Sequence, residues 1–465
     1  MKITFLGGVG TVTGSSYLIR TNRVHILLEC GLFQGKRQES YERNRHFDFE
    51  PRRVDAVVLS HAHIDHSGNL PNLVLQGCTA PIYTTHATRD LCASMLPDSG
   101  RIQEADVAYV NKKRARKGEP PVEPLYTEED ALFSLQGMVG VGYNHTLEIA
   151  RDVRLTFFDA GHILGSAMVL LESKEHGRPV RLLFSGDLGQ PGLAIVRDPT
   201  PMPPTDYLMI ESTYGDREHP PIEDARAMLA DAITQIVQRN GRIIIPAFAV
   251  GRTQEIIYAL HELHLQGQIP DVPIYVDSPL AVNVTEVFRQ HPECYDQETR
   301  RLIQAIETAD PLGFRQLKYI HDVEESKALN TAPNPMVIIS ASGMAEAGRV
   351  QHHLKHAITD SNNMVLITGW QAPNTLGRRI AEREPVVRIF GEEFPLRAEV
   401  RLAYGYSAHA DRQNLLDWAK PQSAVTRGAF VIHGDPGPAQ ALNEGLRALG
   451  YQRIAIPIQG ETVKL

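Results

Sequence analysis

Short apolar runs dominate the first 210 residues of the chain, and each run is bounded by Gly, Asp or Pro. Six of these runs have the length and composition of buried β-strands, and they cover 24–31, 54–60, 153–161, 167–173, 180–187 and 206–212. The opening MKITFLGGVGTVTGSSYLI predicts two further strands around a Gly-rich turn. Helical periodicity is scarcer here and predicts a helix over 87–96. This part of the chain therefore predicts a mostly β architecture.

From about residue 222 the pattern changes to an alternation of helices and strands. Helices are predicted over 224–239, 251–264 and 348–358, and strands over 241–250, 273–279, 335–343 and 363–370. Such alternation is typical of βαβ units on a parallel sheet. After about 395 a mainly β pattern returns, with one helix over 411–420 and a strand over 428–435. The rhythm thus predicts a second domain of α/β type that begins near 210.

Composition narrows the class of protein. A chain of 465 residues is long enough for two or three domains, and its 42% hydrophobic and 22% charged content is that of a folded protein. Lys and Arg total 47 against 55 Asp and Glu, which gives a net charge of −8. The net charge therefore gives no sign of a broad basic surface for nucleic acid, and any polyanion site must be a local patch or a metal centre. No apolar run is long enough for a transmembrane helix.

Two further features bear on location and surface. The four cysteines, Cys30, Cys78, Cys92 and Cys294, have no CxxC spacing, which argues against a disulfide framework and a thiolate zinc site and favours a reducing cytoplasm. The basic, Pro-rich segment 111–124 is interpreted as a solvated loop beside a helix end, with a phosphate-contact patch as the alternative.

The segment HAHIDH, residues 61–66, concentrates side chains that bind metals. His61 and His63, two apart on extended backbone, point the same way and can share one metal, while Asp65 and His66 come from the following turn and can hold a second. A chance match to this pattern in a chain with 19 histidines is on the order of one in a thousand. Imidazole suits zinc, and the absence of nearby Cys or Met argues against copper and iron–sulfur sites.

Three other strand ends carry residues that can bind a metal, namely His162, Asp187 and His433. Ligands collect outside the carboxyl ends of strands in α/β sheets, so these residues can converge with His61. We expect His61, His63 and His162 to hold one zinc ion, and Asp65, His66 and His433 to hold another. We expect Asp187 to bridge the two ions, because a carboxylate can be shared by two cations.

HAHIDH, DAGHILGSA (159–167) and FSGDLG (184–189) resemble motifs two to four of the metallo-β-lactamase superfamily. That resemblance implies an αββα sandwich and a dinuclear zinc site. Six further segments resemble the β-CASP group of RNA-processing nucleases within it: IESTYGD, PAFAVGRTQE, DSPLA, SASGMAEAGR, YSAHAD and VIHGD. In that group an α/β domain is inserted into the lactamase-like domain. The resemblance therefore implies lactamase-like segments at 1–208 and 395–465 and a β-CASP domain at 209–394.

The resemblance also implies roles for individual residues. Glu211 falls at motif A, His409 at motif B and His433 at motif C, where a histidine favours RNA over DNA. His409 would protonate the departing 3′ oxygen, with Glu211 orienting its ring and Asp65 also in the catalytic set. The implied reaction is hydrolysis of single-stranded RNA to 5′-phosphate and 3′-hydroxyl ends, either internally or from a 5′ end.

One residue departs from the family pattern, and three are weaker candidates. Glu29 stands where the first motif usually has Asp, so we expect it to orient the site as that Asp does, with a lower metal affinity. Arg252, Ser342 and Gly343 lie at predicted helix starts and are candidates for binding RNA phosphates, with helix capping as the alternative. The segment HHLKH (352–356) is interpreted as a helix surface rather than a third metal site.

Two other functions are compatible with the motifs. One is hydrolysis of a small ester or thioester at the same metal site, and the other is a non-catalytic scaffold subunit of an RNA-processing complex. The long insertion and His409 argue against the first, and the complete set of ligands argues against the second. A homodimer is the default expectation for oligomeric state.

Overall fold

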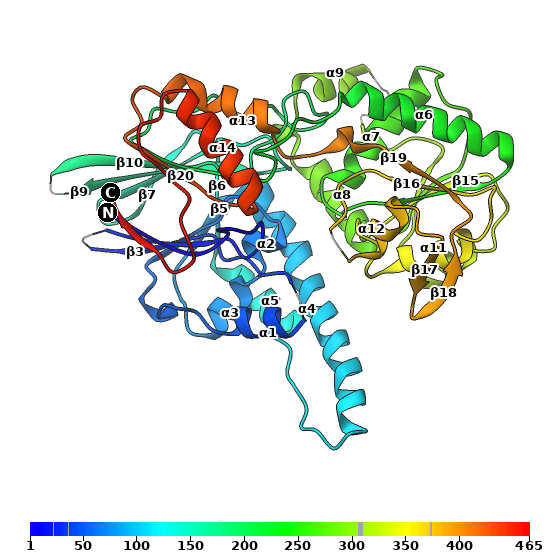
Figure 1. Ribbon diagram of the computed structural model, residues 1–465, viewed down its shortest axis with the longest axis horizontal. Helices are drawn as coiled ribbons and strands as arrows, with labels where there is room; N and C mark the ends of the chain where they lie inside the picture. The colour runs from blue at the N-terminus through cyan, green and yellow to red at the C-terminus, as the bar shows by residue number, and fades with distance from the viewer. Residues whose placement is uncertain (22, 36, 176, 306–309, 373) are drawn as a thin grey trace. The chain divides into compact units, whose positions relative to one another are not determined.

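The computed structural model describes residues 1–465 except 22, 36, 176, 306–309 and 373. It divides into two compact units, coloured along the chain in Figure 1. Unit 1 comprises Met1–Pro191, Asp198–Glu218 and His409–Leu465, and unit 2 comprises Gly192–Arg197 and His219–Ala408. The domain boundaries expected from the sequence, at 208/209 and 394/395, stay a prediction.

Unit 1 contains two seven-stranded sheets. The first has the order β22-β1-β2-β3-β4-β5-β6, with strands Thr462–Lys464, Lys2–Gly7, Ser16–Arg20, His25–Leu28, Ala56–Val58, Ile82–Thr85 and Met138–Val141. The second has the order β21-β20-β11-β10-β9-β8-β7, with strands Ile454–Ala455, Gly428–Val431, Tyr207–Ile210, Arg178–Phe184, Ala167–Glu175, Val153–Asp159 and Thr146–Ala150. A buried apolar cluster joins the two sheets, with Phe5 and Tyr17 from the first packed among Phe157 and Phe184 from the second.

Helices cover the outer faces of this sandwich, which confirms the αββα architecture. On the second sheet, α13 (Arg412–Ala419) and α14 (Pro436–Ala448) bury Leu415, Leu442 and Leu446 against strand residues. On the side of the first sheet lie α1 (Arg37–Arg45), α2 (Ile64–Ser67), α3 (Leu70–Leu75), α4 (His86–Ala115) and α5 (Glu128–Ser134) (Figure 1). Short 3₁₀ turns η1 (Pro51–Arg53), η2 (Leu135–Gly137) and η5 (Lys420–Gln422) complete the unit.

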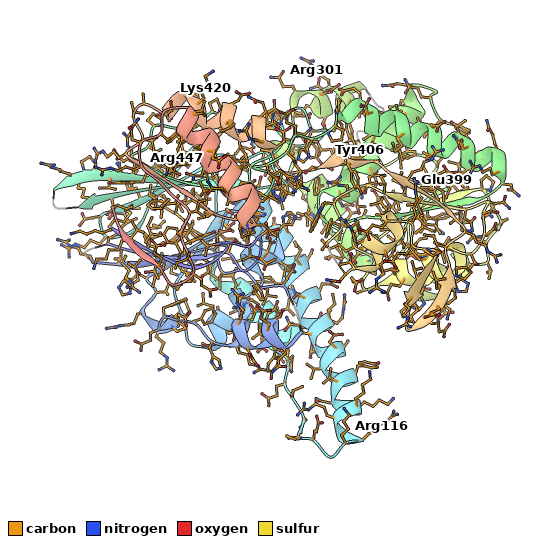
Figure 2. All side chains as sticks on the ribbon, viewed as in Figure 1. Arg116, Arg301, Glu399, Tyr406, Lys420 and Arg447 are labelled. Carbon is orange, nitrogen blue, oxygen red and sulfur yellow. The ribbon has the colours of Figure 1, made fainter. Side chains whose placement is uncertain are left out.

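Helix α4 is much longer than the predicted 87–96, because it continues through Pro97 to Ala115. Its buried positions end at Gly100, so its C-terminal half has no apolar stripe from which a helix could be predicted. That half extends away from the sheets, and Arg116 lies near its tip (Figure 2). The basic segment therefore begins as helix and only then becomes the expected exposed loop, where Arg114 pairs with Glu119 at 3.1 Å.

The last segment of the chain is part of both sheets. Strand β20 pairs in parallel with β11 in the second sheet, and β22 pairs antiparallel with β1 in the first. The segment that follows unit 2 in sequence is thus built into the core of unit 1.

Unit 2 is an α/β unit around a six-stranded sheet of order β14-β13-β15-β12-β16-β19, in which every pairing is parallel. Its strands are Leu317–Tyr319, Ile274–Val276, Met336–Ser340, Arg242–Pro246, Met364–Ile367 and Glu399–Leu402. Its helices are α6 (Ile222–Arg239), α7 (Arg252–Leu265), α8 (Pro279–Gln290), α9 (Gln297–Ala305), α10 (Val323–Leu329), α11 (Arg349–Ala357) and α12 (Leu376–Ala381). A hairpin of β17 (Val386–Ile389) and β18 (Glu392–Pro395) and the turns η3 (Pro292–Cys294) and η4 (Tyr404–Tyr406) complete it. The predicted parallel sheet is therefore confirmed.

Two properties concern the whole described chain. All four cysteines lie in the described part and are buried as free thiols. None of the described helices combines the length and the apolar content that crossing a bilayer requires.

Candidate metal centre

The seven predicted ligands meet at one edge of unit 1. Strand β4 ends just before His61, and α2 begins directly after His63, so HAHIDH turns from extended chain into helix. His162, Asp187 and His433 follow the ends of β8, β10 and β20 in the other sheet. The structure gathers the donor atoms into two groups, His61, His63, His162 and Asp187 in one, and Asp65, His66 and His433 in the other.

Distances in the first group suit a tetrahedral ion. His63 Nδ1 lies 3.2 Å from His61 Nε2 and 3.2 Å from His162 Nε2. Asp187 Oδ2 lies 3.5 Å from His61 Nε2 and 3.7 Å from His162 Nε2. Zinc–nitrogen bonds of about 2.0 to 2.1 Å put neighbouring tetrahedral ligands about 3.4 Å apart. The four donors therefore have the spacing of one zinc coordination sphere.

The second group has similar spacing. His66 Nε2 lies 3.2 Å from His433 Nε2, and Asp65 Oδ2 lies 3.8 Å and 3.5 Å from these two nitrogens. Asp187 Oδ2 is also 3.4 Å from His66 Nε2. This one carboxylate oxygen is therefore within ligand spacing of nitrogens in both groups, as a bridging ligand must be.

The chemistry of the donors fits a bound cation. Burial, outweighing Asp65 and Asp187, lowers the pKa of His63 to about 4, so its ring is neutral at pH 7 and has a lone pair to offer. Buried ring nitrogens face one another at 3.2 Å, an arrangement in which lone pairs repel unless a proton or cation lies between them. Asp187 Oδ1 is buried and lies 3.2 Å from His433 Nδ1, without the geometry of a hydrogen bond from any described residue. These residues fit zinc.

Carboxylates in the centre are held in the charged form. Burial opposes ionisation, but His433, His66 and His61 hold the pKa of Asp187 well below its usual range. Burial likewise disfavours the charged form of His66, yet Asp187 and Asp65 raise the pKa of that imidazole well above 6.5. A metal ion at His66 would therefore compete with a proton for this ring.

Glu29 lies directly behind His66. Its Oε2 is 2.5 Å from His66 Nδ1, and the carboxylate accepts hydrogen bonds from the Ser60 amide at 2.7 Å and the Ser60 hydroxyl at 2.8 Å. A carboxylate at Nδ1 fixes the ring so that Nε2 faces the second donor group. Glu29 has a φ of +63°, an unusual value for a residue with a side chain. The surrounding structure therefore holds Glu29 in a backbone conformation that such a residue does not favour on its own.

His409 and Glu211 form a pair beside the two groups. His409 Nδ1 lies 3.3 Å from Glu211 Oε1 and 3.9 Å from Asp187 Oδ2. Burial disfavours the imidazolium, but Glu211 and Asp187 raise the pKa of His409 to about 9. Glu211 is fully buried, and its carboxylate accepts hydrogen bonds from the amides of Leu188 at 2.6 Å and Thr213 at 3.3 Å. These carboxylates therefore favour the protonated form of the His409 imidazole, and the fixed carboxylate of Glu211 holds its ring.

Comparisons with known proteins agree with this geometry. The chain is 36% identical over 465 residues to a ribonuclease of Thermus thermophilus, and the match covers all of both proteins. Family models match residues 9–148 (metallo-beta-lactamase superfamily), 253–380 (Beta-Casp domain) and 393–457 (Zn-dependent metallo-hydrolase RNA specificity domain). The chain belongs to the β-CASP group of the metallo-β-lactamase superfamily.

Two other matches extend this result. A transcription termination factor FttA of Methanocaldococcus jannaschii is 28% identical over 476 residues, covering 100% of this chain and 72% of that protein. A crystal structure of a protein of unknown function from Enterococcus faecalis has a TM-score of 0.55 at 15% identity, covering 100% of this chain and 99% of that one, and it supports the fold. As a β-CASP protein, the chain is a metallo-hydrolase.

The weaker candidates lie in unit 2, and their phosphate-binding role stays a prediction. Arg252 donates to the Thr368 carbonyl at 2.6 Å, and its Nε lies 3.4 Å from Glu255 Oε2. The Ser342 hydroxyl accepts from the Glu346 amide at 3.2 Å within its own loop. Gly343 is buried beneath Phe248. All three are therefore engaged in holding loops at the ends of β12, β15 and β16.

Two other places in unit 2 hold no metal-like group among the described residues. In HHLKH, His353 is buried rather than on the helix surface, with Nε2 2.6 Å from Asp277 Oδ2 and Nδ1 2.9 Å from Asn330 Oδ1.

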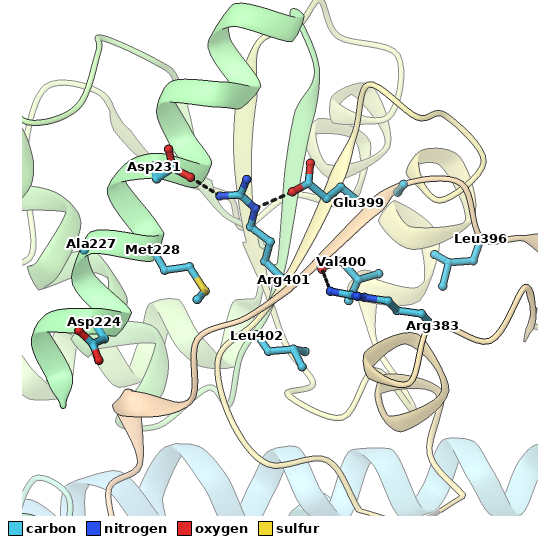
Figure 3. A pocket seen from close by; sticks show the side chains of 11 residues that line it. Asp224, Ala227, Met228, Asp231, Arg383, Leu396, Glu399, Val400, Arg401 and Leu402 are labelled. Carbon is cyan, nitrogen blue, oxygen red and sulfur yellow. Dashed lines mark hydrogen bonds and ion pairs between the residues drawn. The ribbon is translucent and has the colours of Figure 1, made fainter. Parts of the chain in front are cut away.

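A groove of about 940 Å³ beside β19 has no His or Cys in its lining. There Arg401 donates to Asp231 and Glu399 at 2.6 Å each (Figure 3).

Sequence reasoning missed several supporting residues. Ser60 Oγ lies 3.0 Å from His61 Nδ1, and Thr213 Oγ1 lies 3.3 Å from His433 Nδ1. Ser60 directly precedes HAHIDH and Thr213 follows Glu211 by two positions, so proximity to the motifs was the available signal. A hydroxyl in a motif has many local partners, however, and the sequence does not choose among them.

Glu29→Gln is expected to lower zinc affinity by about 10 to 100-fold, because the neutral amide no longer polarises and orients His66. Competition with a chromogenic chelator measures the change. Glu148→Gln, on an exposed position of β7, is the matched control and should bind zinc like the parent. Equal zinc affinities of Glu29→Gln and the parent would show that Glu29 does not support metal binding.

In the metal-free protein, we expect His409 to titrate with a pKa of about 9 and Glu211→Gln to lower that pKa, because the main stabilising charge is lost. NMR of the His409 ring protons against pH measures both values. A raised folded pKa means that this pair contributes stability below about pH 6.5, which is lost as the pH rises through about 9. A parent His409 that titrates near 6.5 would contradict the pairing.

Proposed function

We propose that this protein is a zinc-dependent ribonuclease that hydrolyses phosphodiester bonds in single-stranded RNA, leaving 5′-phosphate and 3′-hydroxyl ends. The observation that carries the proposal is the position of His409, whose ring Glu211 holds at 3.3 Å beside two groups of metal donors. A hydrolysis needs a nucleophile on one side of phosphorus and a proton for the group that leaves. The donor groups and the His409–Glu211 pair supply these two requirements from one edge of unit 1.

Two zinc ions per chain are part of the proposal. His61, His63 and His162 would hold one, Asp65, His66 and His433 the other, and Asp187 would bridge them. Zinc, when bound, lowers the pKa of water to about 7 and so supplies the nucleophile at neutral pH. Glu29 would keep His66 in the orientation that presents Nε2 to the site.

His409 would act as the general acid. Because Nδ1 faces Glu211, the opposite ring nitrogen, Nε2, is the atom that would give its proton to the departing 3′ oxygen. Glu211 serves as a positioning residue: its buried carboxylate orients the ring and keeps it charged. After the bond breaks, the neutral imidazole can take a proton from solvent and restore the starting state.

RNA as the substrate is supported by the match of residues 393–457 to the RNA specificity domain and by the full-length similarity to a ribonuclease. His433 at motif C points the same way. A homodimer and a cytoplasmic location stay predictions, and light scattering of the purified protein tests the first.

Cleavage of a 5′-labelled single-stranded RNA by the zinc-loaded protein tests the proposal, beside DNA of the same sequence. We expect RNA to be cut, Asp65→Ala to abolish cutting, and His145→Ala, at an exposed position of unit 1, to cut like the parent. Ligation of the products to a 3′-hydroxyl acceptor checks for the 5′-phosphate, and the fragment ladder separates internal from end-directed cutting. An intact RNA in the presence of two bound zinc ions would reject the ribonuclease and favour a small-ester substrate.

A further inference from the structure

Three aromatic rings are exposed in loops that follow the carboxyl ends of strands in the unit 2 sheet. Phe248, Trp370 and Tyr404 have 45%, 40% and 39% of their surface exposed. Each follows a different strand within three residues: Phe248 comes after β12, Trp370 after β16 and Tyr404 after β19. A large exposed ring at one such loop is ordinary, but the same feature after three strands in turn calls for an explanation.

These three strands are neighbours in the sheet, in the order β12-β16-β19, and all run in parallel. Their carboxyl ends therefore lie on the same side of the sheet, with neighbouring strands about 4.8 Å apart. Open α/β sheets bind ligands outside the carboxyl ends of their strands. The topology thus sets the three loops, each of which carries an exposed ring, side by side where a ligand of the sheet would lie.

The loops that carry the first two rings are firmly held. The Phe248 carbonyl accepts hydrogen bonds from the Thr253 amide at 3.2 Å and the Thr253 hydroxyl at 2.7 Å. The Phe248 ring lies against Gly343, in the loop after the adjacent β15, where an added Cβ would come within 2.8 Å of Phe248 Cδ2. Gly343 therefore lacks a side chain at the point where the ring needs the space.

Trp370 is tied to the same loop. The adjacent Gln371 is only 3% exposed, and its amide donates to the carbonyls of Gly343 and Gly369, each at 3.1 Å. Arg252 holds the preceding Thr368 carbonyl. Phe248 and Trp370 are thus presented by backbone that buried side chains fix in place, which is the condition for a preorganised binding surface.

We propose that Phe248, Trp370 and Tyr404 form a row on which bases of single-stranded RNA stack; the inference rests on the proposed ribonuclease function. Every base has a flat π-face, so stacking on exposed aromatic rings binds single strands whatever their sequence. The net charge of −8 leaves little general attraction for phosphates, so a contribution to RNA affinity that does not depend on charge is what this chain needs.

Another exposed ring of unit 2 supplies the contrast. Phe390 is 50% exposed but lies in the β17–β18 turn and packs on His352, with ring centroids 4.6 Å apart. It matches Phe248 in residue type and exposure without belonging to the row. Phe390→Leu is therefore the matched control for Phe248→Leu.

Fluorescence anisotropy of a labelled oligo(A) RNA, with full-length Asp65→Ala protein as the non-cleaving parent, tests the row. We expect Phe248→Leu and Trp370→Leu each to weaken binding about tenfold, and Trp370→Phe and Phe390→Leu to leave it within about twofold. Because no charge is removed, the slope of log affinity against log salt concentration should not change. With an oligomer of abasic ribose phosphates, parent and variants should bind equally.

A second measurement needs no change in the row. The chain has two tryptophans, Trp370 and Trp418, so in Trp418→Phe the emission reports Trp370 alone, and RNA should quench it with the same midpoint as the anisotropy. If the parent binds oligo(A) while the leucine variants bind equally well and the emission does not change, the stacking row is wrong and the ribonuclease stands. A parent that binds no RNA would overturn both.

Discussion

Asp187→Asn is expected to abolish RNA cleavage and to reduce bound zinc from two ions per chain to one or none. Its Oδ2 lies 3.4 Å, 3.5 Å and 3.7 Å from ring nitrogens of His66, His61 and His162, and so borders both donor groups. The amide keeps the shape but loses the negative charge that a bridging ligand contributes. Loss of an orienting partner alone costs about 10 to 100-fold in affinity, and loss of a shared ligand should cost more. Mass spectrometry under native conditions measures the zinc content.

Asp152→Asn is the matched control for this substitution. Asp152 is about half exposed, pairs with Arg23 at 3.0 Å, and has a φ of +62° that asparagine also accepts. It should retain two zinc ions and parent activity. Asp187→Asn protein with two tightly bound zinc ions would show that the groups do not depend on a shared carboxylate.

His409→Ala is expected to slow RNA cleavage by about 10² to 10⁴-fold while two zinc ions stay bound, because it removes the proton donor and no proposed ligand. The sharper test changes the leaving group. Bis(p-nitrophenyl) phosphate releases a phenolate that needs no proton, so the variant should hydrolyse it at close to the parent rate. Rates on the two substrates, with zinc content, separate a general acid from a structural residue.

His145→Ala again serves as the control and should match the parent on both substrates. An equal slowing of His409→Ala on RNA and on the nitrophenyl ester would mean that the ring supports the site in some way other than proton donation. Glu211→Gln should follow His409→Ala in direction on RNA, because it lowers the pKa of the same imidazole.

The metal centre could be anticipated because its signals are local. HAHIDH concentrates its donors in six positions, and His162, Asp187 and His433 each follow an apolar run that the sheets then align. Ligands collect outside the carboxyl ends of strands in α/β sheets, and this expectation can be applied without knowing how the strands pair. Asp187 was expected from the sequence to bridge the two groups, but its distances could not be predicted, since they depend on how the two sheets pack.

Two features were not predicted from the sequence: the full length of α4 and the set of exposed aromatic rings in unit 2. The second half of α4 contributes no buried residue to the core; its half-buried side contacts the loop that follows it, mainly through polar groups such as Asn111, which exchanges two hydrogen bonds with the Val122 backbone at 2.9 Å. The aromatic row was invisible because Phe248, Trp370 and Tyr404 are 156 positions apart from first to last and are aligned only by the strand order β12-β16-β19. Single exposed aromatics in a sequence carry no such information.

The built-in C-terminal segment has a consequence for synthesis. His409 and His433 lie in the segment that follows unit 2, and the strands β20 and β22 that complete the two sheets come from it too. A nascent chain still attached to the ribosome before this segment emerges has neither a complete sandwich nor a complete set of ligands. The candidate metal centre can therefore form only after the last strands have joined the first.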